Sequence, residues 1–110
     1  MPRDTSDLLR GTLDLLVLRA LATQPLHGFG VSRWIEDRTH NELEIVDSAL
    51  YKALYRLEDA GAIVAEWGVS ENNRKAKYYS LTTRGRQMLR AETATWKRYV
   101  AAVSGALEPA

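Results

Sequence analysis

The sequence predicts a mainly α-helical fold with one small β-hairpin, a winged helix-turn-helix followed by a C-terminal dimerisation helix. Three observations predict it. Apolar residues recur at helical spacing in four segments, and the period changes to two on either side of a polar turn at 69–76. The last helical segment is also longer than a small core needs. We expect residues 1–82 to form the winged domain and 83–110 the dimerisation helix.

The composition fits one small globular domain. The chain has 110 residues, 45% of them hydrophobic and 26% charged. A core of this size is marginal alone, so association with a second chain would help. There is no cysteine and no signal-peptide pattern at the N-terminus, which predicts a cytoplasmic protein. The most apolar stretch, 8–22, is broken by Arg10, Asp14 and Arg19 and does not resemble a membrane span.

The first helix is expected at 6–23, capped by Ser6. Its apolar stripe consists of Leu9, Leu13, Leu16, Val17 and Leu21. Leu8, Leu15 and Leu18 widen the stripe beyond what one small core buries, which indicates a partner chain.

A turn at 23–28 leads to a second helix at 29–39, and a connection at 40–46 leads to a third helix. Asp47 or Ser48 is the expected cap of that third helix, and Gly61 its stop signal. Its inward row is Leu50, Leu54 and Leu57. The opposite side presents Ser48, Lys52 and Arg56 in one row and Tyr51 and Tyr55 in the next.

Two alternating segments, 62–68 and 77–82, predict the hairpin, and Thr82 or Thr83 is the expected cap of the last helix. Trp34 and Trp67 are interpreted as packing residues. The apolar side of the last helix carries Leu89, Trp96, Tyr99, Val100 and Val103, interrupted by Glu92.

The order helix, helix, helix, hairpin, helix is that of a winged helix-turn-helix, in which the third helix enters the major groove of DNA. Charge is distributed accordingly: residues 1–47 have a net charge of −3 and residues 48–110 of +4. A chance scatter of solvated charges would explain this asymmetry equally well. The predicted DNA-binding residues are Ser48, Tyr51, Lys52, Tyr55 and Arg56 on the third helix, and Arg74, Lys75 and Lys77 on the wing.

The chain resembles the PadR family of bacterial transcriptional regulators, in its short form with a single C-terminal helix. The resemblance covers roughly residues 8 to 100. The segments that carry it are "LLRGTLDLLVLRAL", "HGFGVSRWIE", "ALYKALYRLEDAGAI" and "RKAKYYSLTTRGRQML". The segments "EWGVSENNRKAKYYSLT" and "AETATW" are similar to a subgroup common in acidobacteria.

This resemblance implies a homodimeric repressor that pairs through its first and last helices. It would bind a pseudo-palindromic operator in double-stranded DNA and leave it when an effector arrives. It also implies a second-helix contact near His27 and Phe29. Two departures bear on the site: Phe29 replaces the family's usual tyrosine, and the wing reads Asn73, Arg74, Lys75, Ala76, Lys77 where many relatives have Gly-Arg-Pro-Arg-Lys.

Trp96 has two interpretations. In a multidrug-sensing branch of the family a tryptophan of the last helix stacks on flat ligands between the subunits. A small aromatic or amphipathic effector would then sit among Leu15, Arg19, Trp96, Tyr99 and Val100. Burial in the dimer core is the alternative.

No catalytic constellation is present, and two lone histidines without cysteine predict neither a metal site nor a cofactor. We therefore do not expect an enzyme. A protein-interaction module is the main alternative, although an exposed third helix with Ser48, Lys52 and Arg56 argues against it. Constitutive DNA binding without an effector also stays open.

Overall fold

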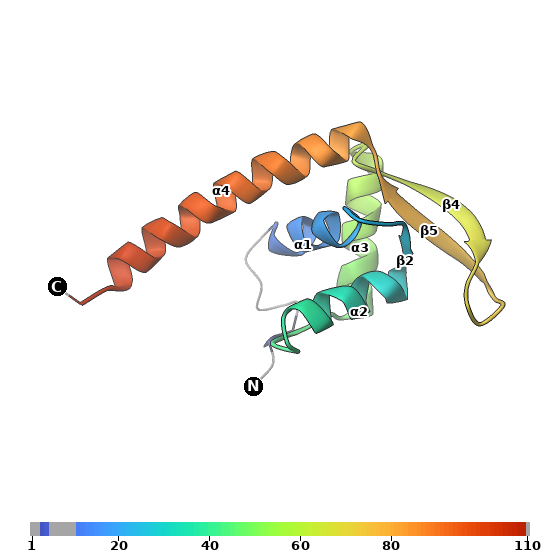
Figure 1. The fold of residues 1–110 in the computed structure, drawn as a ribbon, viewed down its shortest axis with the longest axis horizontal. Coiled ribbons are helices and arrows are strands. Elements are labelled where there is room, and N and C mark those ends of the chain that lie inside the picture. The colour runs from blue at the N-terminus through green and yellow to red at the C-terminus, as the bar shows by residue number, and fades with distance from the viewer. Residues whose placement is uncertain (1–2, 5–10, 110) are drawn as a thin grey trace.

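The computed structural model describes residues 3–4 and 11–109, which form four helices and five short strands (Figure 1). The helices are α1 (Thr12–Ala20), α2 (Gly28–Arg38), α3 (Asp47–Asp59) and α4 (Thr83–Leu107). The strands are β1 (Arg3–Asp4), β2 (Leu26–His27), β3 (Leu43–Glu44), β4 (Ile63–Val69) and β5 (Lys75–Leu81). β1 pairs in parallel with β3, and β2, β5 and β4 form an antiparallel sheet in that order.

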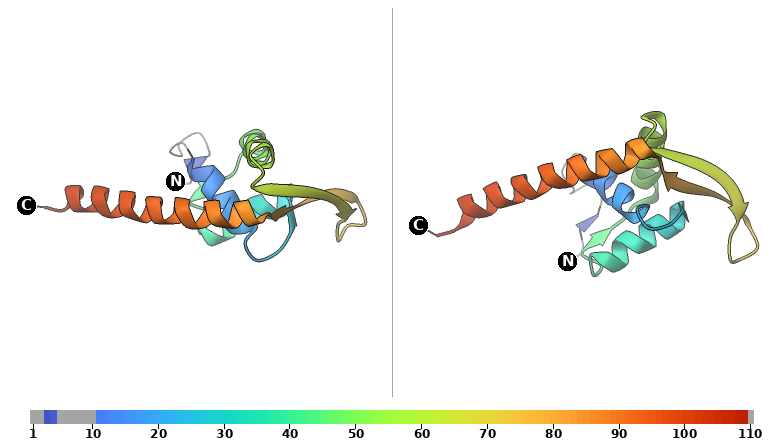
Figure 2. Two further views of the ribbon diagram at one scale, coloured as in Figure 1. Left: turned by 90° about the horizontal axis from the view of Figure 1, so that it is seen from above. Right: turned by 45° about the horizontal axis from the view of Figure 1, so that its top comes forward.

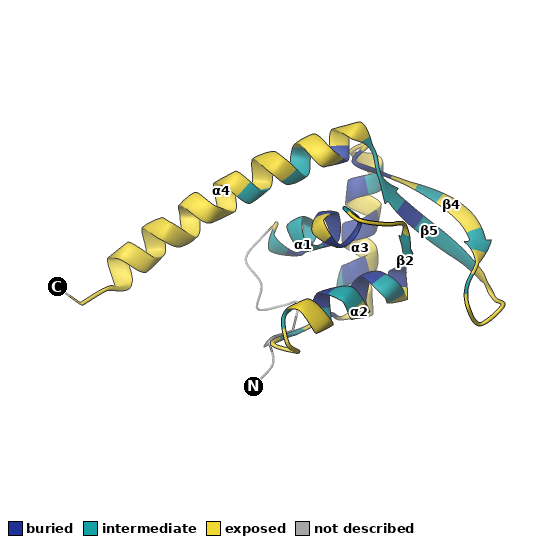
Figure 3. Cartoon of the chain, in the orientation of Figure 1, coloured by how far each residue is buried: buried dark blue, intermediate teal, exposed yellow. Residues whose placement is uncertain are grey.

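The core lies where α1, α2 and α3 meet the base of the hairpin (Figures 1 and 3). Its largest fully buried side chains are Val17, Leu18, Val31, Ile35, Leu50, Leu54 and Ile63. The predicted winged helix-turn-helix is confirmed, with α2 and α3 as the helix-turn-helix and the β4–β5 hairpin as the wing. Leu18, which was predicted to widen the apolar stripe of the first helix toward a partner chain, is instead buried in the protein's own core.

The first helix is shorter than predicted. α1 begins at Thr12 instead of residue 6, because Gly11 has φ 86°, a left-handed conformation that no α-helix contains. It ends at Ala20 instead of 23. The predicted cap Ser6, and Leu8 and Leu9, lie outside the described residues.

The predicted cap of α3 is also wrong. Val46 occupies the cap position and makes no side-chain hydrogen bond to the helix, while Asp47 and Ser48 belong to the first turn. The entry to α3 is fixed from α2 instead: the Ile45 N–H donates to Glu36 Oε2 at 3.1 Å. The predicted stop at Gly61 is confirmed by its φ of 75°.

The turn of the wing is tighter than the predicted 69–76. Asn73 has φ 59°, and the Ser70 N–H donates to the Arg74 carbonyl at 2.8 Å. Because asparagine tolerates the left-handed region, the chain reverses quickly and β5 begins at Lys75. Lys75 therefore lies on a strand of the wing instead of in its loop, next to Lys77, which was predicted on that strand.

α4 starts at a junction built around Thr82. The Thr82 N–H donates to the Ala62 carbonyl at 3.1 Å, its Oγ1 donates to the Gly61 carbonyl at 2.6 Å, and the same Oγ1 accepts from the Gly85 N–H at 3.0 Å. The prediction of Thr82 as a cap is thus confirmed. From this junction α4 runs for 25 residues, and its distal half is exposed and extends away from the other helices (Figures 2 and 3).

Candidate nucleic-acid interface

The exposed face of α3 carries all five side chains that the sequence placed there. Leu50, Ala53, Leu54 and Leu57 are buried on the opposite face. Tyr51 is 53% and Tyr55 74% exposed, large values for aromatic rings in so small a protein. A shallow depression is lined by Ser48, Tyr51, Lys52, Tyr55 and Arg56. The helix therefore offers hydroxyl and cationic donors to solvent from one continuous surface.

The side chain of Tyr51, from α3, packs against Gly28 at the start of α2. A Cβ added at Gly28 would lie 2.6 Å from the Tyr51 Oη and 3.0 Å from its Cζ. Only glycine leaves room for the phenol ring at this place. Gly28 is therefore a packing glycine.

Arg56 differs from the other cations of α3 because an acid of α1 holds it. Its Nη2 donates to Asp14 Oδ1 at 2.6 Å and its Nε donates to Asp14 Oδ2 at 3.3 Å. The hydrogen bonds to Asp14 raise the pKa of Arg56 above its ordinary value. This two-point pairing was not foreseen from the sequence, since Asp14 and Arg56 are 42 residues apart.

The three wing cations lie in different surroundings. Lys75 Nζ is 5.3 Å from the centroid of the Trp67 ring, and Lys77 Nζ is 3.9 Å from Glu58 Oε1. Among the described residues, Arg74 at the tip has no acidic group within ion-pair distance. The wing thus carries one cation at its tip, one above an aromatic ring and one near an acid.

Trp67 is not a packing residue, contrary to the prediction. It is 62% exposed, and together with Phe29, which is 65% exposed, it borders a groove between the wing and the start of α2 and α3. Strand alternation places Trp67 on the inner face of the wing but cannot tell how far the hairpin extends beyond the core. Trp34, by contrast, packs against the core as predicted.

His27 caps α2 and borders the same groove. Its Nδ1 accepts from the Gly30 N–H at 3.0 Å, so a neutral ring carries its hydrogen on Nε2. Its ring lies 5.3 Å from that of Tyr78. Within residues 3–4 and 11–109, no three potential ligand side chains form a metal-binding group. No helix in the same part of the chain is long and apolar enough to cross a membrane.

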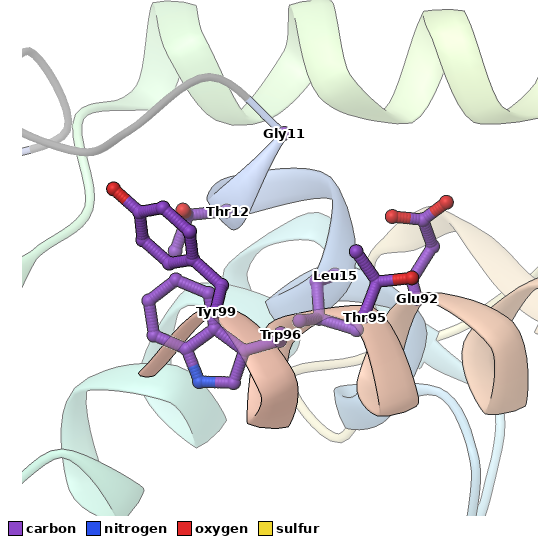
Figure 4. Close-up of a pocket in the computed structure, with 7 residues that line it drawn as sticks. All are labelled: Gly11, Thr12, Leu15, Glu92, Thr95, Trp96 and Tyr99. Atoms are coloured by element: carbon purple, nitrogen blue, oxygen red, sulfur yellow. The ribbon is translucent and has the colours of Figure 1, made fainter. Parts of the chain in front are cut away.

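A second cavity lies between α1 and α4 and has a volume of about 320 Å³ (Figure 4). Three of the residues predicted around an effector, Leu15, Trp96 and Tyr99, line it, and the two aromatic rings are 5.9 Å apart. Arg19, which lies in the last turn of α1, and Val100 do not line it. The remaining lining residues are Gly11, Thr12, Glu92 and Thr95. Glu92, predicted only as an interruption of the apolar stripe, adds a carboxylate to this cavity.

Comparison with known proteins gives consistent matches. The family described as "Transcriptional regulator PadR-like family" matches residues 17–91. A transcriptional regulator from Clostridium thermocellum is 26% identical with a TM-score of 0.83, covering 94% of this chain and 98% of that one. A PadR family transcriptional regulator from Eggerthella lenta is 32% identical with a TM-score of 0.77, covering 92% and 86%. Bacillus subtilis PadR, solved in complex with operator DNA, has the same fold at 23% identity and a TM-score of 0.66, covering 74% and 46%.

Proposed function

Because the chain belongs to the PadR-like family of transcriptional regulators, we propose that it is a homodimeric repressor that binds a pseudo-palindromic operator. The observation that carries this proposal is the exposed face of α3, where two tyrosines, a serine, a lysine and an arginine lie beside a cationic wing. The Bacillus subtilis relative bound to operator DNA supports the same role for this fold.

In the proposed complex α3 lies in the major groove and the wing follows the DNA backbone. Lys52 has no acidic group within ion-pair distance among the described residues, so it is available for a phosphate or a guanine edge. Ser48, Tyr51 and Tyr55 donate hydroxyl hydrogen bonds to phosphates. Arg74, Lys75 and Lys77 add affinity that depends on salt and little on sequence.

Dimerisation is proposed through α1 and the distal part of α4. Five large apolar side chains of α4 are exposed in the single chain, namely Trp96, Tyr99, Val100, Val103 and Leu107. A helix that extends from its domain with such a stripe needs a partner surface, and a second copy offers the same stripe. Paired α4 helices would set two α3 helices about one DNA turn, roughly 34 Å, apart.

The cavity beside Trp96 is the proposed effector site. Two aromatic rings and the Glu92 carboxylate suit a flat aromatic ligand that carries a positive charge. Such a ligand would release the operator if it bound more tightly to a dimer with a different angle between subunits. A Trp96→Phe variant should lose the tryptophan fluorescence quenching caused by this ligand. Quenching at Trp96 with unchanged operator affinity would refute the effector role.

The main test measures fluorescence anisotropy of a labelled duplex from the protein's own upstream region, against a scrambled duplex, at several salt concentrations. We expect tight, sequence-dependent binding with a steep salt dependence, lost in a Lys52→Ala and Arg74→Ala double variant. An Arg90→Ala and Lys97→Ala double variant removes the same charge from α4 and should bind nearly as the wild type does. Equal loss in both double variants, or equal affinity for both duplexes, would contradict operator recognition.

A further inference from the structure

The Asp14–Arg56 pair joins the two functional regions of the molecule. Arg56 belongs to the exposed surface of α3, whereas Asp14 belongs to the first turn of α1, next to Leu15 of the effector cavity. The two side chains meet through two hydrogen bonds, in the arrangement that an arginine also uses to grip a phosphate. The Asp14 carboxylate therefore occupies the edge of the guanidinium that a DNA phosphate would take.

The pair is open to solvent and can separate. The Arg56 side chain is 55% exposed and that of Asp14 is 27% exposed. An exposed ion pair of this kind is only weakly stable, so a nearby phosphate can displace the carboxylate. Separation leaves no buried unpaired charge, because water reaches both groups.

We propose that Asp14 competes with the DNA backbone for Arg56, so that Arg56 exchanges a carboxylate for a phosphate when the protein binds DNA. This inference rests on the proposed function. It makes Asp14 a residue that limits DNA affinity without touching DNA. A shift of α1 would also move Asp14 and so change how strongly Arg56 of α3 is held.

The exchange has a characteristic salt dependence. When a lysine or arginine neutralises a phosphate, a condensed cation leaves the DNA. If that arginine must first leave a carboxylate, salt also weakens the ion pair that has to break, and this offsets part of the salt dependence. Without the carboxylate, the slope of log K against log salt should steepen, by less than the value of about 0.9 for one full phosphate contact.

The test is a double-variant cycle of Asp14→Asn and Arg56→Gln, measured by anisotropy with a labelled duplex of mixed sequence across a range of salt. Asp47→Asn is the matched control, because Asp47 is an exposed acid at the start of the same α3 surface. We expect Asp14→Asn to bind at least threefold tighter than wild type with the steeper slope, and to lose both changes in the Arg56→Gln background. Asp47→Asn should change the affinity equally with and without Arg56. Thermal unfolding of each variant checks that the domain stays folded.

Three results would overturn the inference. An equal gain from Asp14→Asn with and without Arg56 would mean that only the overall charge matters. Weaker binding by a folded Asp14→Asn variant would mean that Asp14 orients Arg56 toward DNA instead of withholding it. If neither the wild type nor any variant binds any duplex, the proposed function and this inference both fail. In the first two results the wild type still binds DNA, so only this inference fails.

Discussion

Gly85 lies where the first turn of α4 crosses the connection between α3 and β4, and its replacement by alanine should severely destabilise the fold. A Cβ at this position would lie 2.0 Å from the carbonyl oxygen of Ala62. An ordinary carbon–oxygen contact is about 3.3 Å, so the two backbones must separate by about 1.3 Å. Neither partner is a flexible side chain, so the shift must move α4 or the base of the wing.

The cost has two parts. Overpacking in a closely packed site costs about 1–3 kcal/mol. The displaced Ala62 carbonyl also accepts from the Thr82 N–H at 3.1 Å, and loss of that bond costs about 0.5–1.5 kcal/mol. We expect Gly85→Ala to reduce the free energy of unfolding by about 2–4 kcal/mol, which at roughly 4 °C per kcal/mol lowers Tm by about 8–16 °C in a domain of this size.

The assay is urea and thermal unfolding followed by helical circular dichroism, at one fixed protein concentration because association contributes to stability. Gly105→Ala is the internal control in the same helix, since nothing lies within 4 Å of its added Cβ. That variant should gain about 0.5–1 kcal/mol from the lower entropy of its unfolded chain. A loss below 1 kcal/mol in Gly85→Ala, or equal changes in both variants, would refute the reasoning.

Three further predictions concern the interface and its support. Gly28→Ala should push the half-exposed Tyr51 ring aside. The free energy of unfolding should stay within about 1 kcal/mol of wild type, while operator affinity falls about fivefold. Unchanged anisotropy titrations would contradict this. Trp67→Ala should weaken binding to the matched and the scrambled duplex by the same factor, about threefold, because Lys75 loses the aromatic ring beneath it. Trp67→Phe should retain most of the affinity. A loss confined to the matched duplex would argue for base contact. Burial, and then the charges of Glu58 and Tyr51, raise the pKa of Tyr79 above 10.0 in the folded protein. The folded state therefore keeps this proton longer than the unfolded state, so the contribution of Tyr79 to the free energy of unfolding should be constant below about pH 9 and be lost as the pH rises past 10. Tyr79→Phe should flatten that decrease, and an unchanged pH dependence would show that other groups cause it.

The sequence predicted those features that repeat locally. The row of Leu50, Leu54 and Leu57, the stop at Gly61 and the cap at Thr82 follow from helical spacing and from the backbone preferences of glycine and threonine. The change of period at the hairpin likewise identified the wing. Each of these signals lies within a few neighbouring residues.

What the sequence did not predict depends on segments that meet only after folding. Asp14 reaches Arg56 because α1 packs against α3, and Gly28 accommodates Tyr51 because α2 begins beside α3. Trp67 is exposed because the wing extends beyond the core, which strand alternation does not encode. The start of α1 was predicted wrongly because the apolar stripe gave no sign of the left-handed backbone at Gly11.

The Thr82 junction also has a mechanical consequence. At a rise of 1.5 Å per residue, α4 is about 37 Å long; it starts at the Thr82 corner of the domain, and its proximal half packs beside α1. A rotation of about 5° at that corner moves the far end by roughly 3 Å, comparable to one residue's advance along a strand. The same three hydrogen bonds of Thr82 and Gly85 hold the base of the wing and the end of α3. α4 is therefore attached at the same point as both candidate DNA-contacting elements, so a displacement of its tip would act directly on the end of α3 and the base of the wing.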